Sequence, residues 1–523
     1  MGVTKSTKYP DGSNIGLHDG YATDPLKKTP SDPIKKEFLS NIELNHFGFF
    51  TMTAGNETDA QTTSLIFPPI TEGMPYSPGH YHGNFLAMTL YAGGMEVLPD
   101  AGYPNKPANN RYFHMNAAVH NTAWVWSQDG SNYSSRGTQP SRPSLLAYDD
   151  GLRNNKQIQV IEASQPQAVE DKIDMKRRML MEIQTSDNTS YTFDLQRLKG
   201  GTVHENFFRA SEDEDCTLTT ELPTEEVDST LQQYVKSLGK EGGLASSETL
   251  ITTEKTAKGG EDFNFTWTGD RTGTSVNMFI KGVKDSNIAF SKMPTLRRTY
   301  NDPEVKDKFP NWHYYQRADV TPDDISQFGG VYEGVKAGAK ASVVNSDWID
   351  IDSSSKMTSL TKVSLADGSM DYIYVSDDDK EREYDDITFG GKIVVIRIKD
   401  GNPVWSYIYG NGTLKYKDTD AVGQQEFTYP IVASQGSLNG SIDNKVQIKG
   451  VINKDIDLKG LYVFMNFGDG SGIGNKVEKF EESEIWVRND PGFEVSNAKA
   501  KMVYFPSKYD PDAKNYNSHA LNN

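Results

Sequence analysis

The amino-acid sequence predicts an all-β protein made of antiparallel sheets. Apolar and polar residues alternate with a period of two along several segments that are rich in aromatic and β-branched residues. This pattern is typical of strands with one buried face. Glycine accounts for 45 of the 523 residues, which indicates many tight turns. Helical periodicity is rare, so we expect sheets to form the cores.

Two β-hairpins are the clearest elements. Residues 179–184 and 191–195 flank the turn sequence Ser186-Asp187-Asn188, as in a hairpin. Residues 392–409 read as a second hairpin with its turn at residues 400–402. Both segments carry apolar residues on alternate positions, so we expect each hairpin to cover a core with one face.

The strand pattern continues toward the C-terminus. We expect the chain to turn again at Gly410-Asn411-Gly412 and to continue the sheet over residues 413–416. Residues 446–452 and 461–467 predict further strands of the same kind. The C-terminal part of the chain therefore predicts a second all-β region.

One helix is predicted, over residues 224–239. Thr224-Glu225-Glu226 places acidic residues in its first turn, and apolar residues recur at helical spacing from Val227 onward. Gly239 follows the last of them and is a common helix terminator.

Length and pattern together predict three segments. A chain of 523 residues exceeds what one ordinary core organises. Residues 1–45 are rich in Lys, Pro, Asp and Gly and show little periodicity, which indicates an extended lead-in or linker. We expect one large β-domain over residues 46–345 and a C-terminal β-domain over residues 346–523.

Composition excludes several classes of protein. Lys and Arg number 54 against 72 Asp and Glu, a net charge of -18, so the basic footprint of a general nucleic-acid binder is lacking. The single cysteine, Cys216, excludes an intrachain disulfide and a cysteine-based zinc site. No run of 18 apolar residues predicts a membrane span. The first residues lack a hydrophobic signal core, so an exported protein would carry its signal on a segment not included here.

The densest chemical signal lies between residues 76 and 122. This stretch holds four of the nine histidines, namely His80, His82, His114 and His120. His80 and His82 form an H-x-H pair, whose side chains point to the same face if the segment is a strand. Asp100 follows His82 by 18 residues, and His120 follows Asp100 by 20.

Two or three imidazoles with one carboxylate are a donor set that zinc accepts. Residue chemistry alone allows both His80 and His82 to bind the metal. It also allows a purely structural alternative, in which these histidines cap turns or bond to neighbouring backbone.

The same stretch resembles the signature of the heparinase II/III-like polysaccharide lyases. Gly79-His80-Tyr81-His82, then Leu98-Pro99-Asp100-Ala101-Gly102-Tyr103, then His120-Asn121-Thr122 follow that family's order and spacing. Looser similarities occur at Gly200-Gly201-Thr202-Val203-His204, Gln316-Arg317, residues 328–333 and residues 490–493. The resemblance implies a large antiparallel β-sandwich followed by a smaller C-terminal β-sandwich.

The resemblance also implies roles for individual residues. His82, Asp100 and His120 would be the ligands of a structural zinc ion, and His80 would be the catalytic histidine. His204 would line the substrate cleft, although a strand-end histidine bonded to backbone is an equally simple interpretation.

Two departures from the family pattern affect this reading. An Asp often follows the family's H-x-H pair, whereas Gly83-Asn84 stands here, so a hydrogen bond is retained without a charge. Family members usually begin with a helical α/α toroid that supplies a catalytic tyrosine. The sequence shows no such multi-helix region.

Two functions of different classes follow from these observations. The first is a periplasmic or secreted lyase that cleaves an anionic, uronic-acid-containing polysaccharide by β-elimination, together with a toroid domain or chain. The alternative is a non-catalytic, zinc-stabilised β-sandwich for carbohydrate binding or surface assembly.

Overall fold

The computed structural model describes most of the chain outside a set of gaps. The described residues are 7–16, 39–69, 82–100, 102, 113–126, 143–165, 173–239, 250–295, 310–423, 427–437, 440–452, 457–467, 471–492 and 501–504. Within these ranges the secondary structure is mostly antiparallel strands, with a single α-helix, α2 (Leu231–Ser237). The predicted all-β class is confirmed. No helix in the described ranges is long and apolar enough to cross a membrane.

The chain divides into two compact units. Unit 1 comprises Met1–Glu43, Gly48–Ser141 and Gln165–Ser342, and unit 2 comprises Leu44–Phe47, Arg142–Ser164 and Val343–Asn523. The two therefore separate near residue 343, but unit 2 also takes in two short segments from earlier in the chain. Strand periodicity marks where strands lie and not which strands they pair with, so these segments carry no sequence signal of their membership.

Unit 1 contains three groups of strands. The first is a meander in the order β2-β3-β4-β5, preceded by the short strand β1 (Glu43–Leu44) at the unit boundary. The other two groups run β12-β15-β16-β19-β10-β9 and β13-β14-β17-β18-β11-β6. The bounds are β2 Phe49–Ala54, β3 Gln61–Ile66, β4 Ala87–Ala92, β5 Met95–Leu98, β6 Ala123–Trp126, β9 Ile173–Ser186, β10 Thr189–Gly200, β11 Val203–Arg209, β12 Cys216–Thr220, β13 Glu225–Thr230, β14 Thr252–Lys258, β15 Phe263–Gly269, β16 Ser275–Ile280, β17 Asn287–Pro294, β18 Pro310–Asp319 and β19 Ile325–Val335.

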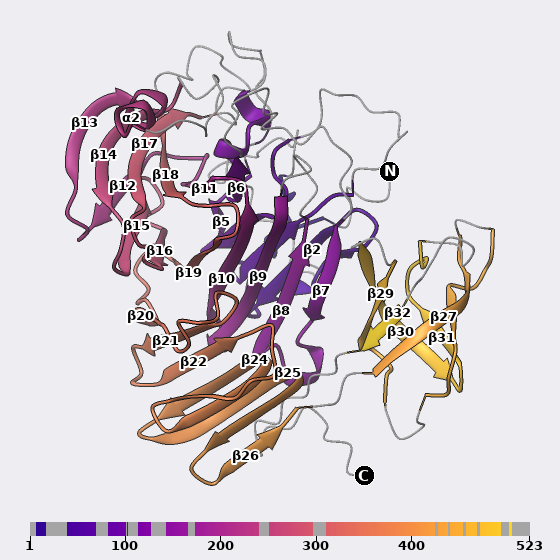
Figure 1. The fold of residues 1–523 in the computed structure, drawn as a ribbon. Coiled ribbons are helices and arrows are strands. Elements are labelled where there is room, and N and C mark those ends of the chain that lie inside the picture. The colour runs from indigo at the N-terminus through magenta and orange to yellow at the C-terminus, as the bar shows by residue number, and fades with distance from the viewer. Residues whose placement is uncertain are drawn as a thin grey trace. The chain divides into compact units, whose positions relative to one another are not determined.

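The first predicted hairpin is confirmed as β9 and β10, which lie side by side in Figure 1. Asp187 and Asn188 separate the two strands, and the pairing runs from Ser190 opposite Gln184 to Leu198 opposite Lys176. The buried carboxylate of Glu182 in β9 accepts hydrogen bonds from Gln61 and Thr63 in β3. This hairpin therefore joins the meander through side-chain contacts.

The predicted helix is half right. Residues 225–230 form β13, which pairs with β14, and only residues 231–237 are helical. Thr230 starts the helix with a capping box: its side chain accepts from the Gln233 amide, while the Gln233 side chain accepts from the Thr230 amide. The acidic residues at 225 and 226 misled the prediction because they resemble a first helical turn.

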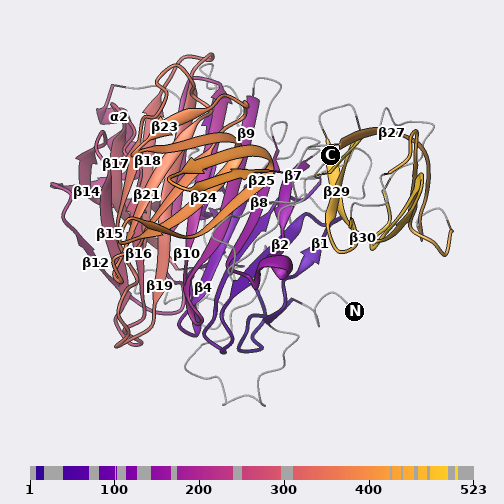
Figure 2. The same cartoon turned by 90° about the horizontal axis from the view of Figure 1, so that it is seen from below.

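Unit 2 contains two groups of strands, in the orders β20-β21-β22-β24-β25-β26 and β8-β7-β30-β29-β32-β27-β28-β31. The long strands β24 and β25 lie side by side in Figure 2, and β23 pairs with β24. The bounds are β7 Ser144–Asp149, β8 Ile158–Ser164, β20 Val343–Ile349, β21 Ser359–Leu365, β22 Met370–Val375, β23 Arg382–Tyr384, β24 Ile387–Lys399, β25 Asn402–Tyr416, β26 Thr419–Val422, β27 Phe427–Gln435, β28 Lys445–Ile448, β29 Tyr462–Asn466, β30 Gly472–Glu481, β31 Glu484–Val487 and β32 Lys501–Tyr504.

The second predicted hairpin is confirmed as β24 and β25, turned by Asp400 and Gly401 in left-handed conformation. The predicted second turn at residues 410–412 is wrong, because β25 continues through it to Tyr416. The pairing shifts register between Gly391 and Ile393, so the glycines accommodate a bulge instead of a reversal. The strands predicted at 446–452 and 461–467 correspond to β28 and β29.

Within the predicted lead-in, the structure describes residues 7–16 and 39–45. Residues 7–16 form a small turn closed by a bridge between Lys8 and Asn14. Tyr9 is 1% exposed, its ring stacks on Tyr91 with centroids 4.4 Å apart, and its hydroxyl donates to Glu96 at 2.5 Å. The turn therefore packs on strands β4 and β5 of its own unit.

Replacing the turn glycine Gly201 by alanine is expected to destabilise unit 1 strongly. Gly201 has a φ of 63°, and a Cβ there would overlap the Trp126 carbonyl oxygen. Left-handed strain of about 1–2 kcal/mol would add to a packing clash of about 1–3 kcal/mol. Urea unfolding followed by tryptophan fluorescence measures the loss.

Gly239→Ala is the matched control. Its φ is 68°, but apart from its chain neighbours no atom of the described residues lies within 4 Å of the added Cβ, so only the strain of about 1–2 kcal/mol is expected. Equal losses in the two variants would contradict the clash at Gly201.

Candidate metal centre

Four buried polar side chains gather at one end of strands β4 and β5 in unit 1. They are His82, Asp100, His114 and His120, with 1%, 4%, 4% and 1% of their surface exposed. His82 lies five residues before β4, and Asp100 lies two residues after β5. His114 lies in the 3-10 turn η3 (Phe113–Met115), and His120 caps the 3-10 turn η4 (Ala117–Val119).

Asp100 and His120 are in direct contact. The Nδ1 atom of His120 lies 2.5 Å from the Oδ1 atom of Asp100, which is shorter than an ordinary hydrogen bond. The amide of Asn84 donates to the other oxygen of Asp100 at 3.4 Å. The ring of His82 completes the group, with its centroid 5.4 Å from that of His120 and 5.1 Å from that of His114. The structure thus brings together all three residues predicted as ligands.

Two successive 3-10 turns fix where His114 and His120 lie. The Asn116 side chain accepts from the Ala118 amide and starts η4, and the His120 amide donates to the Ala117 carbonyl. The Gly83 amide donates to the Met115 carbonyl at 2.8 Å, which ties the segment of His82 to the turn of His114. The stretch from residue 113 to 120 is therefore held by its own backbone and by the segment it faces.

Asn121 connects the segment that carries Asp100 to the segment that carries His120. Its side-chain amide donates to the Met88 carbonyl at 3.0 Å and to the Pro99 carbonyl at 2.9 Å. Its side-chain oxygen accepts from the Arg209 amide at 2.9 Å. Pro99 directly precedes Asp100, and Asn121 directly follows His120, so this one side chain sets the spacing of the contacting pair.

Two buried arginines donate hydrogen bonds to backbone carbonyls next to His82 and His120. Arg178 forms a bidentate ion pair with Asp194, at 2.9 and 2.7 Å, and also donates to the carbonyls of Leu86 and Asn121. Arg209 donates to the Val119 carbonyl and pairs with Glu212. Sequence reasoning missed both arginines. A charged residue within an otherwise apolar strand was the available signal, because buried arginines need partners.

The donor types suit a zinc ion, but the arrangement is not that of a formed site. Among the described residues, no group of three or more His, Cys, Asp or Glu side chains has the geometry to hold a metal. The Nδ1 atom of His120 and the Oδ1 atom of Asp100 are bonded to each other. The Nε2 atom of His120 is buried and meets no hydrogen-bond partner in the described part of the chain.

The remaining predicted site residues have different outcomes. His80 lies outside the described residues. His204 is fully buried, with Nδ1 2.7 Å from the Ser326 hydroxyl and Nε2 2.8 Å from the Gly200 carbonyl oxygen. Burial lowers the pKa of His204 to about 4. The structure therefore gives His204 the bonding of a structural, neutral histidine.

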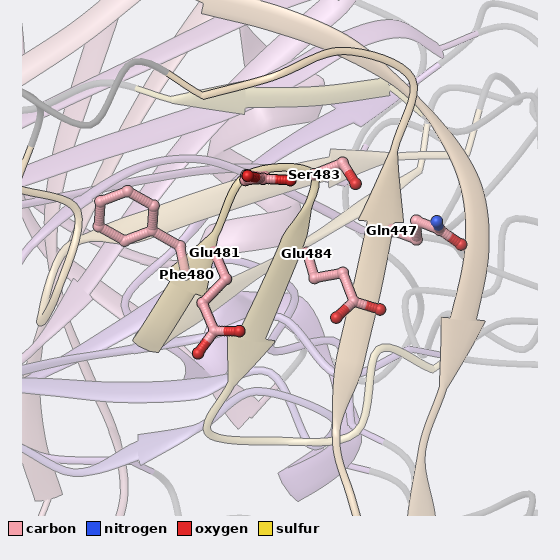
Figure 3. Close-up of a pocket in the computed structure, with 6 residues that line it drawn as sticks. Gln447, Phe480, Glu481, Ser483 and Glu484 are labelled. Atoms are coloured by element: carbon pink, nitrogen blue, oxygen red, sulfur yellow. The ribbon is translucent and has the colours of Figure 1, made fainter.

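A hollow of about 540 Å³ lies in unit 2, at the hairpin of β30 and β31. Figure 3 shows Phe480, Glu481 and Glu484 on this hairpin and Gln447 on a neighbouring strand. Glu482 and Ser483 complete the lining, and no predicted site residue is part of it. Its three carboxylates make it a poor site for an anionic polysaccharide.

Comparison with known proteins bears out the sequence resemblance for part of the chain. Residues 40–189 match the family described as heparinase II/III-like, C-terminal, a stretch that includes His82, Asp100 and His120. No curated protein matches the chain.

Comparison with solved structures finds only distant similarities. Heparan sulfate lyase HepC from Pedobacter heparinus is 12% identical, with 71% of this chain and 51% of that chain covered and a TM-score of 0.45. A heparinase III structure is 13% identical over 72% and 53% of the two chains, with a TM-score of 0.46. A Paenibacillus xanthan lyase is 8% identical over 86% and 48%, with a TM-score of 0.33. The chain thus spans about half the length of these proteins.

Asn121→Ala is expected to lower the free energy of unfolding by about 2–4 kcal/mol, because it removes three buried hydrogen bonds and leaves their backbone partners unsatisfied. Thermal unfolding of the metal-free protein measures this. Asn121→Asp retains the acceptor for Arg209 but loses the two donated bonds and places a carboxylate oxygen against the two carbonyls, so it should be at least as destabilising. A variant as stable as the wild type would show that Asn121 does not set the spacing of the centre.

The pKa of His204 predicts how acid affects stability. Because this pKa lies near 4 in the folded state against an ordinary value of 6.5, the unfolded chain takes up a proton that the folded chain refuses. Stability should fall as the pH drops from 6.5 to 4, by about 3 kcal/mol in total for this group. In His204→Gln the loss between pH 7 and pH 4, measured by urea unfolding, should be smaller by that amount. Identical pH profiles would mean that His204 titrates normally.

Proposed function

We propose that this chain is the β-sheet module of a polysaccharide lyase that cleaves a uronic-acid-containing polysaccharide by β-elimination. The observation that supports the proposal best is the buried group of His82, Asp100 and His120. It lies inside the stretch that matches the heparinase II/III-like family, directly after the candidate catalytic residue His80. The complete enzyme would also include an α/α toroid domain or chain and would act in the periplasm or outside the cell.

The reaction removes a proton and a leaving group from adjacent carbons. A base takes the proton on C5 of the uronic acid, the C4–O bond breaks, and the electron pair forms a C4=C5 double bond. An acid protonates the departing glycosidic oxygen. Negative charge develops on the uronate carboxylate, so the site must neutralise it. His80 suits one of the two proton transfers, since an imidazole titrates near neutral pH. The toroid would supply its tyrosine partner.

His82, Asp100 and His120 would hold a zinc ion in this proposal. Bound there, zinc would act as a structural cross-link between the segments before β4 and after β5 and the end of η4. His80 lies only two residues from His82, so the same cross-link would fix the position of the catalytic imidazole.

A second candidate function is a non-catalytic, zinc-stabilised β-protein that binds carbohydrate or assembles with a surface partner. The net charge of -18 favours it, because an acidic protein repels an anionic substrate. The acidic hollow in unit 2 also favours this alternative, because its carboxylates repel an anionic substrate. Binding of polysaccharide by the complete assembly without formation of unsaturated product would support this alternative.

His80→Ala should slow elimination strongly while leaving metal binding intact. Loss of a general acid or base lowers the rate by about 10²–10⁴-fold. The assay is the ultraviolet absorbance of unsaturated products across uronate polysaccharides, with the helical part of the enzyme present.

His82→Ala should instead lose zinc, from about one ion per chain in the wild type, as measured by elemental analysis. His46→Ala, an exposed histidine, is the matched control for both readouts. Full activity in His80→Ala would contradict the assignment of His80 as a catalytic residue.

A further inference from the structure

We infer that Lys176 is a positioning residue that holds the turn of residues 84–87, through which the chain passes from His82 into strand β4. The inference rests on the proposed function, because the candidate catalytic residue His80 lies on the same stretch of chain, two residues before His82. It goes beyond that function, since the motif around His80 and His82 includes no residue of β9.

The 84–87 turn has an unfavourable backbone conformation. The Ala87 amide donates to the Asn84 carbonyl at 3.0 Å and closes the turn, while Leu86 has a φ of 54°. A left-handed backbone is unfavourable for a residue with a Cβ, and this position of a turn normally holds glycine or asparagine. The Leu86 side chain is also fully buried. Such conformations persist where the surrounding structure fixes them, and they cluster at functional sites.

Three side chains donate hydrogen bonds to the two central carbonyls of the 84–87 turn. The Phe85 carbonyl accepts from the Lys176 amine at 2.9 Å and from the Thr122 hydroxyl at 2.7 Å. The Leu86 carbonyl accepts from Arg178 at 2.8 Å. Two of the three donors therefore come from β9. Rotation of either peptide out of this conformation would break at least one buried hydrogen bond.

Lys176 is the donor whose presence the packing alone does not explain. It is 2% exposed, and its amine nitrogen lies 4.6 Å from the centroid of the Trp124 ring. Burial, and in second place the charge of Arg178, lower the pKa of Lys176 well below its ordinary value. An apolar side chain of similar length would fill this space without burying an amine. The contact that requires an amine is the one with the Phe85 carbonyl.

The 84–87 turn fixes where the segment before it begins. The Asn84 side chain, at the first position of the turn, donates to Asp100 at 3.4 Å. The amide of the preceding Gly83 donates to the Met115 carbonyl at 2.8 Å. A turn that changed conformation would disturb both contacts and with them the position of His82. Lys176 would thus act on the reaction through the backbone, without touching the reacting atoms.

The test measures amide hydrogen exchange in the full chain, with the peptide that contains the 84–87 turn as the readout. Lys176→Met keeps the length of the side chain and removes its donor. Thr122→Val removes the other donor to the same carbonyl, and it is the second variant if Lys176→Met does not fold. Lys199→Met is the matched control, because Lys199 lies on the partner strand β10 and its amine is 3.5 Å from Asp174.

We expect Lys176→Met to speed exchange of the Ala87 amide by about 2–10-fold, the effect of losing one buried hydrogen bond. Exchange along the rest of β9 and β10 should not change, and Lys199→Met should match the wild type throughout. Lys176→Met combined with Thr122→Val should exceed the product of the two single effects, because both donors to one carbonyl are then lost.

The elimination assay with the helical part of the enzyme present tests the link to the reaction. Lys176→Met should lower kcat and leave KM nearly unchanged, since the turn positions a catalytic group and does not bind substrate. Lys199→Met should alter neither value.

Three results would overturn the inference. Unchanged exchange of the turn in Lys176→Met would show that Lys176 does not hold it. Equal acceleration along the whole of β9 would indicate a general loss of stability. An unchanged kcat in Lys176→Met, beside an active wild type, would remove the positioning role. An inactive wild-type assembly would instead overturn the proposed function, and hydrogen exchange would still decide whether Lys176 holds the turn.

Discussion

The contact between Asp100 and His120 is the interaction around which this part of the molecule is organised. A carboxylate that is 4% exposed is costly to bury, and the imidazole at 2.5 Å offsets that cost. The two residues come from segments 20 positions apart, so the surrounding structure must bring them together. Asn121 does so by bonding to the residue before Asp100 while it directly follows His120. A metal bound there would replace the hydrogen bond between Asp100 and His120 by several metal–ligand bonds.

The hairpin of β9 and β10 supports the candidate metal centre. Its ion pair between Arg178 and Asp194 lies in the core of unit 1, and the same guanidinium reaches the carbonyls of Leu86 and Asn121. Damage to this pair would release the segments that carry His82 and His120, because a buried charge without its partner is strongly destabilising. Residues far from any catalytic step are therefore expected to control the geometry of the centre. The catalytic proposal requires only that these segments fix the position of His80.

Sequence patterns anticipated elements whose signals are local. The β9–β10 and β24–β25 hairpins follow from alternating residues around Asp187-Asn188 and Asp400-Gly401. Errors arose where partners decide the outcome. Residues 225–226 are strand because β14 pairs with them, and Gly410–Gly412 bulges because β24 continues alongside. The bracing arginines and the inclusion of residues 142–164 in unit 2 depend on contacts between segments far apart in sequence, which no local pattern encodes.

The central claim is that this chain completes a metal site by itself, and a crystal structure of the zinc-loaded protein tests it most directly. Data collected on both sides of the zinc absorption edge would locate the ion without reference to activity or substrate. The account predicts one anomalous peak within about 2.0–2.2 Å of donor atoms of His82, Asp100 and His120, with the Asp100–His120 hydrogen bond opened. The absence of a peak there, with that hydrogen bond intact, would contradict it.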